Sequence, residues 1–273
     1  MPELPEVEVV RRGLADHLIG ATFDEVEVLH PRAARGNDVR LEDILPGLVI
    51  NDVRRRGKYL WFVLSDGFAL VIHLRMSGQM LVGKPGEVTS KHLRIRAQLG
   101  DRELAFVDQR TFGYWQYAPL MDDIPATVSH IAPDPFEGEF DAAEVARRMR
   151  KKNSAVKTVL LDQSIVSGIG SIYADEAMWA AGVLPTRKAK ALRQRDAVRL
   201  LEESREVMLR ALEQGGTSFD ALYVNVNGAS GYFSRSLNAY GQVDQPCARC
   251  GQPIVRTKVN GRSSYFCQNC QKL

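Results

Sequence analysis

The stretch Tyr59-Leu-Trp-Phe-Val-Leu64-Ser-Asp-Gly67-Phe-Ala-Leu-Val-Ile-His-Leu74 decides the fold of the N-terminal part of this 273-residue chain. It contains two runs rich in β-branched and aromatic residues, joined by Ser-Asp-Gly, which is a strong hairpin signal. Strand-like segments follow at residues 80–82, 93–99 and 104–107. With a helix expected at the N-terminus, residues 1–118 predict a two-layer β-sandwich, or a flattened barrel, flanked by helices.

After these strands the pattern changes from sheet to helix. Residues 119–140 contain four prolines and few periodic apolar positions, which indicates a linker. Helical periodicity then covers residues 141–152, 155–161, 171–181 and 194–214, where Gly215 and Gly216 end the last segment. Residues 141–234 therefore form a predicted helical domain, and the whole chain is of the α+β class. Residues 217–233 have no clear period and form a loop long enough to suggest a function.

The last segment, residues 235–273, contains all four cysteines, as Cys247-Ala-Arg-Cys250 and Cys267-Gln-Asn-Cys270. Two Cys-x-x-Cys pairs supply the four thiolates of a tetrahedral zinc site. Two disulfides are the alternative, which a reducing cytoplasm disfavours. We therefore predict one structural Zn²⁺ held by Cys247, Cys250, Cys267 and Cys270 in a β-ribbon zinc finger. Because protein fills all four positions, catalysis is expected elsewhere.

Composition excludes several classes of protein. Hydrophobic residues make up 45% and charged residues 25% of the chain, and no apolar run is long enough to span a membrane. The acidic N-terminus resembles no targeting peptide, so we expect a cytoplasmic protein without membrane contact. The net charge is only +3, but residues 235–273 contain six Lys/Arg and one acidic residue. This basic segment suggests a polyanionic partner, although a solvated surface also explains it.

The N-terminal sequence Met1-Pro-Glu-Leu-Pro-Glu6 contains an unusual nucleophile. Removal of Met1 would leave Pro2 with a secondary amine that is partly neutral at cellular pH. Such an amine forms an iminium ion with an aldehyde carbon, and Glu3 and Glu6 lie close enough in sequence to act as general acid and base. The alternative is that these residues only begin a helix, with Pro5 as its first residue and acids at the positive end of its dipole.

The joint order of several motifs resembles bacterial formamidopyrimidine-DNA glycosylases over essentially the whole chain. These motifs are Met1-Pro-Glu-Leu-Pro-Glu-Val-Glu8, Gly57-Lys-Tyr59, His73-Leu-Arg-Met-Ser-Gly78, Gly168-Ile-Gly-Ser-Ile-Tyr-Ala-Asp-Glu176, Gly231-Tyr-Phe233 and the four-cysteine ribbon. The resemblance implies a glycosylase that removes 8-oxoguanine and formamidopyrimidines from duplex DNA and cleaves the abasic site by β,δ-elimination. It also implies a helix-two-turn-helix element in the helical domain.

The resemblance assigns roles to residues of the N-terminal domain. Pro2 would attack C1′, and Glu3 would assist base release. Met76, Arg110 and Phe112 would fill the space left by the everted base, and Lys58 would contact phosphates near the lesion. A sheet-core position is the alternative for Met76 and Phe112, and a solvated basic run is the interpretation kept for Arg54-Arg-Arg56 before Lys58. Further implied residues are Glu6 and Arg262 at the catalytic site and His92 on DNA.

In the C-terminal part, the resemblance implies DNA contacts by Lys157, Gly170, Ser171 and Tyr240. Arg262 matches an arginine that reaches a phosphate near the everted nucleotide. The family commonly has asparagine where this chain has Ser171, and the shorter hydroxyl predicts a weaker phosphate contact. Residues 223–230 correspond in place to a loop that closes over oxidised guanine.

Two other functions stay open at this point. One is an endonuclease VIII-like glycosylase for oxidised pyrimidines, and the other is a non-catalytic binder of damaged DNA. The start Pro-Glu-Leu-Pro-Glu, with Arg110 and Phe112, favours the purine branch, and a binder is expected to lack Pro2 or Glu3. The expected partner is double-stranded DNA containing oxidised purines, bound by a monomer in the bacterial cytoplasm at the nucleoid.

Overall fold

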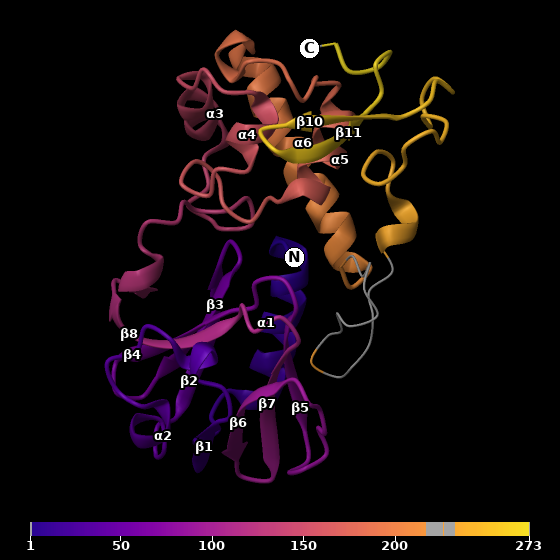
Figure 1. Cartoon of the computed structure of the whole chain (residues 1–273). Helices are drawn as coiled ribbons and strands as arrows, with labels where there is room; N and C mark the ends of the chain where they lie inside the picture. The colour runs from indigo at the N-terminus through magenta and orange to yellow at the C-terminus, as the bar shows by residue number, and fades with distance from the viewer. Residues whose placement is uncertain (1, 217–225, 227–232, 273) are drawn as a thin grey trace. The chain divides into compact units, whose positions relative to one another are not determined.

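The computed structural model describes residues 2–216, 226 and 233–272 and divides the chain into two compact units (Figure 1). The N-terminal unit comprises Met1–Ser129 with Gln214–Tyr232, and the C-terminal unit comprises His130–Glu213 with Phe233–Leu273. The predicted linker therefore differs from the structure. Its first residues continue strand β8 (Tyr114–Met121), which pairs with β9 (Ile124–Pro125), because Leu120 and Met121 remain in register with the sheet.

The N-terminal unit contains two antiparallel sheets, as the hairpin signal predicts. One has the order β1-β6-β7-β5 and the other β2-β3-β4-β8-β9. The strands not yet placed are β1 (Glu25–Val28), β2 (Ile50–Arg56), β3 (Tyr59–Leu64), β4 (Phe68–His73), β5 (Gly78–Gly83), β6 (Leu93–Leu99) and β7 (Arg102–Asp108). Short helices η1 (Pro31–Ala34), α2 (Leu41–Ile44) and η2 (Ala126–Val128) connect or follow them.

One core joins both sheets to helix α1 (Leu4–Leu18). Its buried members include Leu14 of α1, Phe62 of β3 and Phe106 of β7. Gly13 in α1 leaves a notch against the side chain of Val226, and a Cβ at Gly13 would overlap this side chain. Val226 also accepts a backbone hydrogen bond from Val82, at 3.1 Å. The rest of the predicted loop at residues 223–230 lies outside the described residues.

Four strands of this unit, β1, β2, β8 and the short β9, are absent from the sequence-based interpretation. In β2 the run Arg54-Arg-Arg56 is not the solvated face that the sequence suggests. Arg54 pairs with Asp52 at 2.7 Å, and the buried Arg55 pairs with Glu8 of α1 at 3.0 Å. Carboxylates from two elements neutralise the run, so a sequence rich in arginine can lie inside a sheet.

The C-terminal unit is built from helices, of which α3, α4, α5 and α6 lie at the predicted positions, whereas the short η3 and η4 were not predicted. They are α3 (Ala142–Arg150), α4 (Val156–Leu160), α5 (Ser171–Ala181), η3 (Ala189–Ala191), α6 (Gln194–Glu213) and η4 (Phe233–Ser236). Asp141 caps α3, because its Oδ1 accepts hydrogen bonds from the N–H groups of Ala143 and Glu144. Strands β10 (Val255–Val259) and β11 (Arg262–Phe266) form the predicted ribbon. Within the described residues, no helix is long and apolar enough to cross a membrane.

Candidate active site and nucleic-acid interface

The proposed nucleophile precedes helix α1, where two buried glutamates fix the backbone. Pro2 is buried, and Glu3 is the N-cap residue of α1. Glu3 and Glu6 form a reciprocal capping box in which Glu6 Oε2 accepts from Glu3 N at 2.9 Å. Helix α1 begins at Leu4, one residue before the predicted start, so Pro5 is its second residue. The capping interpretation is thus correct for both carboxylates, which belong to the helix start directly after Pro2 in the sequence.

Two further contacts hold this helix start in place. Gly216, with a φ of +86°, lies against Glu6, and a Cβ there would be 3.2 Å from Glu6 Oε1. One turn along α1, Glu8 receives hydrogen bonds from Arg11, Arg12 and Arg55. Burial of Glu8 raises its pKa, but Arg11 and Arg55 outweigh burial and lower the pKa to about 2. The charged carboxylate therefore ties α1 to strand β2.

Lys58 lies in the tight turn between β2 and β3, where Gly57 has a positive φ of 56°. The side chain of Lys58 is buried rather than extended into solvent. Burial restricts the rotamers that this side chain can adopt. This position agrees with the implied role and leaves the contact itself a prediction.

Met76, Arg110 and Phe112, the three predicted space-filling residues, lie on two neighbouring loops. Met76 is 45% exposed and Phe112 is 43% exposed, so neither belongs to the sheet core. Arg110 Nη1 lies 3.5 Å from Met76 Sδ. Arg75 and Thr111 have positive φ values of 54° and 55°, which places strained backbone at both loop tips. Large apolar side chains held outward in this way resemble the wedges that proteins insert into DNA.

Asp108, which sequence reasoning missed, connects these two loops. Its carboxylate is fully buried. Oδ1 accepts hydrogen bonds from Ser77 Oγ at 2.5 Å and from Arg110 N at 3.1 Å, and Oδ2 accepts from Gly113 N at 2.7 Å. One carboxylate thus binds both ends of the Arg110–Phe112 loop and the loop of Met76. Gly113 has no room for a side chain, since a Cβ there would lie 2.5 Å from Phe106 Cζ.

Arg35 and His73 form hydrogen bonds with the backbone of the same loops. Arg35 donates to Phe112 O at 2.6 Å and to Gly113 O at 3.1 Å, and its guanidinium lies 4.4 Å from the ring centroid of Tyr114. His73 Nδ1 accepts from Arg75 N at 2.9 Å. Burial of His73, aided by the charge of Arg75, lowers its pKa to about 3. The imidazole is therefore neutral at cellular pH and remains a hydrogen-bond acceptor for the strained residue.

His92 lies between the 84–91 segment and β6, partly exposed. Its Nδ1 is 3.3 Å from Arg94 Nη2, and its carbonyl accepts from Asp108 N at 2.9 Å. His92 therefore lies next to the buried Asp108 described above. Its contact with DNA stays a prediction.

In the C-terminal unit, Gly170 and Ser171 form the start of α5. Gly170 is the N-cap residue and has no side chain to bond the first N–H groups, and Ser171 is the first helical residue. The preceding turn is held by Gln163, whose side chain bonds Gly168 N at 2.9 Å and Ile169 O at 3.0 Å. A helix start of this kind can present N–H groups to a phosphate. Gln163 is a positioning residue that the sequence did not indicate.

Lys157 is placed differently from the expectation of a direct DNA contact. It is fully buried in α4, and its Nζ lies 2.8 Å from Asp175 Oδ1 and 2.6 Å from Ser263 O. Asp175 also accepts from Ser264 Oγ and Tyr265 N of β11. Burial raises the pKa of Asp175 to about 6 against the opposing effect of Lys157. Removing either partner would leave a buried charge unpaired, at a cost of about 3–5 kcal/mol. Lys157 thus fits a role in holding the zinc ribbon on α5.

Glu176, the next residue of α5, fixes the chain that leads to the ribbon. Its carboxylate accepts from the backbone N–H groups of Asn238, Ala239 and Tyr240, at 2.8 to 3.1 Å. The ring of Tyr240 packs edge-on to Tyr265, with centroids 5.2 Å apart. These contacts give the predicted DNA-binding Tyr240 one defined position.

Arg262 begins β11 at the exposed tip of the ribbon. Asn260 and Gly261 form the tip with positive φ values of 48° and 78°. A hollow of about 240 Å³ lies between this tip and α4, lined by Thr158, Leu161, Asp162, Val259, Asn260 and Arg262. The structure thus places Arg262 at a free surface of the C-terminal unit, as its implied role requires.

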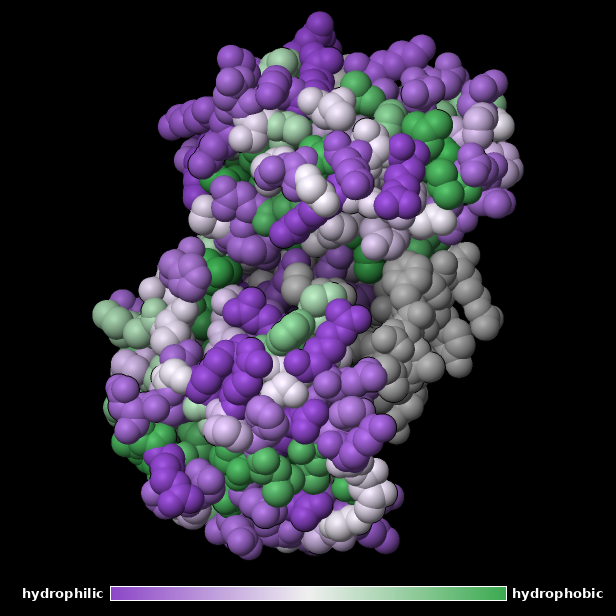
Figure 2. Space-filling view, viewed as in Figure 1, coloured by the Kyte–Doolittle hydropathy of each residue, from purple (hydrophilic) through white to green (hydrophobic). Residues whose placement is uncertain are grey.

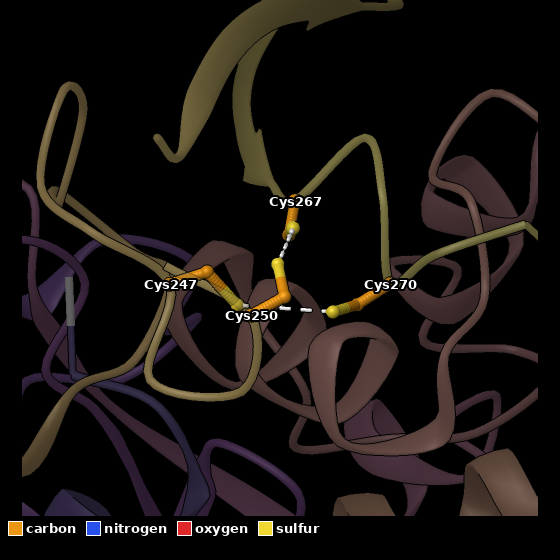
Figure 3. Close-up of side chains that lie close together, drawn as sticks. All are labelled: Cys247, Cys250, Cys267 and Cys270. Atoms are coloured by element: carbon orange, nitrogen blue, oxygen red, sulfur yellow. Dashed lines mark hydrogen bonds between the residues drawn. The ribbon is translucent and has the colours of Figure 1, made fainter. Parts of the chain in front are cut away.

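The four cysteines converge as the sequence predicts (Figure 3). All four Sγ atoms lie within 4.8 Å of one another. The pairs Cys247–Cys270 and Cys250–Cys267 are 3.9 and 3.5 Å apart, too far for disulfide bonds. Burial raises the pKa of Cys247, but Trp179 Nε1 and backbone N–H groups bond to its sulfur and lower the pKa below its usual value. This donor set fits one tetrahedral structural zinc ion.

Comparisons with known proteins cover the whole chain. Residues 1–115 match the formamidopyrimidine-DNA glycosylase N-terminal domain, residues 131–221 match the H2TH domain of that glycosylase, and residues 244–273 match a zinc finger found in FPG and IleRS. The formamidopyrimidine-DNA glycosylase of Corynebacterium urealyticum is 56% identical, with 99% of each chain covered. That of Corynebacterium efficiens is 55% identical, with full coverage of both chains.

Solved structures agree with this result. Lactococcus lactis Fpg bound to abasic-site DNA has a TM-score of 0.88 and 32% identity, and the comparison covers 99% of this chain and all of the other. MutM bound to DNA with carbocyclic 8-oxo-G has a TM-score of 0.88 and 33% identity over the full length of both chains. The α+β fold with its sheet domain, helical domain and zinc finger is confirmed.

Proposed function

Because the chain belongs to the formamidopyrimidine-DNA glycosylase family, we propose that it excises oxidised purines from duplex DNA through an iminium ion formed on Pro2. It is a base excision repair DNA glycosylase with AP lyase activity. The observation that carries the proposed mechanism is the capping box, which fixes two buried carboxylates directly after Pro2.

The reaction divides into steps that these residues can perform. The Pro2 nitrogen bonds to C1′ of the damaged nucleoside while the bond from C1′ to the base breaks, and the departing base takes a proton. Opening of the sugar ring gives an iminium ion, whose charge acidifies the C2′ proton. Loss of that proton expels the 3′ phosphate, and a second elimination expels the 5′ phosphate. Glu3 supplies and removes protons, and Glu6 holds Glu3 and the helix start.

DNA recognition is divided among the two units in this proposal. Met76, Arg110 and Phe112 occupy the space of the everted base, since unstacking costs a few kcal/mol that inserted side chains offset. Lys58, His92, Ser171, Tyr240 and Arg262 contact the backbone near the lesion. Zinc, when bound, stabilises the ribbon that presents Arg262, and it takes no part in the chemistry.

The substrate class is tested by single-turnover excision on four duplexes. They carry 8-oxoguanine opposite cytosine, a formamidopyrimidine, an oxidised pyrimidine or no lesion. We expect the two purine lesions to be excised and cleaved at least tenfold faster than the pyrimidine lesion, and the undamaged duplex to be left intact. A preference for the pyrimidine lesion would favour the endonuclease VIII-like function, and binding without cleavage of any duplex would favour a binder.

The variant Asp108→Asn tests the link between the two loops. The amide nitrogen of asparagine cannot accept a hydrogen bond, so the Arg110–Phe112 loop loses the bond from either Gly113 N or Arg110 N, whereas Ser77 Oγ can accept from the amide N–H. We expect 8-oxoguanine excision to fall about 100-fold, because small misplacements near a reacting centre have effects of this size. Cleavage of a preformed abasic site, which has no base to displace, should fall less than tenfold. Asp101→Asn, at an exposed turn of the same sheet, serves as the control; equal losses on both substrates would contradict the prediction.

The variant Ser171→Asn tests the phosphate contact at the start of α5. Asparagine reaches further than serine and adds N–H donors. We expect binding of lesion duplex to tighten by about three- to tenfold, the value of one added hydrogen bond. Fluorescence anisotropy at fixed salt measures this, and an unchanged dissociation constant would rule out a phosphate contact by residue 171.

We further propose that the enzyme acts as a monomer in the bacterial cytoplasm, in association with the nucleoid. The C-terminal unit presents backbone-binding residues with no need for a second copy. Size-exclusion chromatography with light scattering tests the monomer, and a stable dimer would contradict it.

A further inference from the structure

A concentration of positive charge lies in the helical part of the C-terminal unit, next to Lys157, whose N donates to Pro185 O at 3.3 Å. Residues 144–154 and 185–195 together contain ten Lys/Arg and one acidic residue. The whole chain carries only +3, so these two segments carry +9 and the remaining residues carry −6. A charge imbalance of this size costs self-repulsion, which a bound polyanion would relieve.

The fold brings the two segments together, although they are more than 30 residues apart in the sequence. The first comprises the end of α3 and the chain after it, and the second includes η3. Lys190 N donates to Lys152 O at 3.1 Å, and Ala189 N donates to Ser154 O at 2.9 Å. Arg150 Nε also donates to Leu192 O at 2.8 Å. The cations of both segments therefore share one surface of this unit.

Some of the ten cations are used by the fold itself. Arg147 pairs with Glu144 at 2.8 Å, and Arg150 bonds the η3 segment. Arg148 donates to Ser164 O, and Arg187 donates to Ala191 O. These arginines bind a neighbouring carboxylate or backbone carbonyls and have less capacity for a ligand.

Of the remaining six, Arg195 lies 3.8 Å from Asp196, and the side chains of the other five are exposed. Among the described residues, no hydrogen bond or ion pair involves the side chains of Lys151, Lys188, Lys190 or Arg193. Lys152 is also exposed, and only Asp162, at 3.9 Å, approaches its Nζ. We call these five residues the basic patch. Figure 2 shows much hydrophilic surface on this unit, with apolar areas between.

We propose that the basic patch binds the sugar-phosphate backbone of duplex DNA at a place other than the lesion site. Lysine is a compact point charge suited to phosphate contacts that carry no sequence information. The unit that carries the patch also carries Ser171 and Arg262, so duplex DNA is the polyanion already expected at this unit. The contact is either with the flanking part of the same duplex or with a second duplex, and both share the same phosphate chemistry. This inference rests on the DNA binding that the proposed function includes. It does not depend on catalysis through Pro2.

The test removes three charges without changing the size of the side chains greatly. A triple variant carries Lys151→Gln, Lys188→Gln and Lys190→Gln. The matched control carries Arg40→Gln, Lys84→Gln and Arg210→Gln, three exposed cations outside the patch. Equal thermal unfolding of the two proteins establishes that both fold.

The readout is the affinity for undamaged duplex as a function of salt. Each lost phosphate contact reduces the magnitude of the slope of log K against log salt by about 0.9. The magnitude of the slope should therefore be about 2 to 3 smaller for the patch variant than for the parent. At moderate salt its affinity should fall about tenfold, while the control retains the slope of the parent. Saturating single-turnover excision of 8-oxoguanine should stay unchanged, which separates this result from a failure of the proposed chemistry.

Duplex length distinguishes the two sources of phosphate. If the patch binds flanking DNA, the patch variant should bind a duplex of about 60 base pairs more weakly than the parent does, and a duplex of about 12 base pairs equally well. If it binds a second duplex, the parent saturated with a short lesion duplex still binds a short undamaged one, and the patch variant does not. The proposal is overturned if the patch variant and the control have the same slope of log K against log salt and bind the same number of duplexes in both experiments.

Discussion

Replacing Glu3 with glutamine should slow base release and strand cleavage by about 10²–10⁴-fold while lesion DNA still binds. The substitution separates the two roles of this side chain. Glutamine keeps an acceptor oxygen for the capping box, but it cannot act as a general acid or base. General acid–base catalysis contributes about 10²–10⁴-fold, so the single-turnover rate on 8-oxoguanine should fall within that range. The unfolding temperature should remain close to that of the parent.

The control for Glu3→Gln is Glu42→Gln, which removes a carboxylate from the first turn of α2 in the same unit. It should leave both rate and affinity unchanged. If Glu3→Gln keeps more than a tenth of the parent rate, the proton transfer belongs to another group. If it loses DNA affinity and thermal stability together, its role is only to cap the helix.

Replacing Cys247 with serine should release zinc and abolish DNA binding while the N-terminal unit stays folded. Structural zinc contributes about 10–16 kcal/mol to the folding of zinc-finger peptides, far more than a short ribbon can supply by packing. The small buried cluster around Cys247, Ile254 and Cys267 has few other members. Loss of the ribbon removes Arg262 and releases Tyr240, so affinity for lesion duplex should fall more than about 100-fold.

Three measurements check this prediction. Metal analysis gives the zinc content, anisotropy gives the affinity, and hydrogen exchange of β3 and β4 reports on the N-terminal unit. Gln268→Ala, at an exposed position of the same knuckle, should keep zinc and affinity. Retained affinity in zinc-free Cys247→Ser protein would show that the ribbon is not part of the DNA interface.

Local sequence patterns predicted the elements whose boundaries depend on neighbouring residues. Strands β3 and β6 and helix α5 have the predicted limits, because alternation and a glycine on each side of α5 are local signals. The zinc site was also predictable, since the spacing of four cysteines admits few other arrangements. The roles of Pro2, Glu3 and Arg262 stay predictions, which rest on the resemblance to the family.

The features that the sequence did not indicate depend on partners far along the chain. Strand β2 looks like a solvated basic run until Glu8 of α1 neutralises Arg55. Asp108 and Asp175 look like ordinary surface acids, and only the fold buries them among donors from other loops. The same holds for the basic patch, whose two halves join through backbone bonds between Lys152 and Lys190.

The central claim is that the nitrogen of Pro2 forms the covalent intermediate, and one measurement tests it directly. Borohydride is added during reaction with a duplex carrying 8-oxoguanine opposite cytosine, and the trapped protein is digested and mapped by mass spectrometry. The account predicts that the reduced adduct lies on the N-terminal peptide, on Pro2 with Met1 removed. An adduct on Lys58, Lys157 or any other lysine, with Pro2 unmodified, would contradict it.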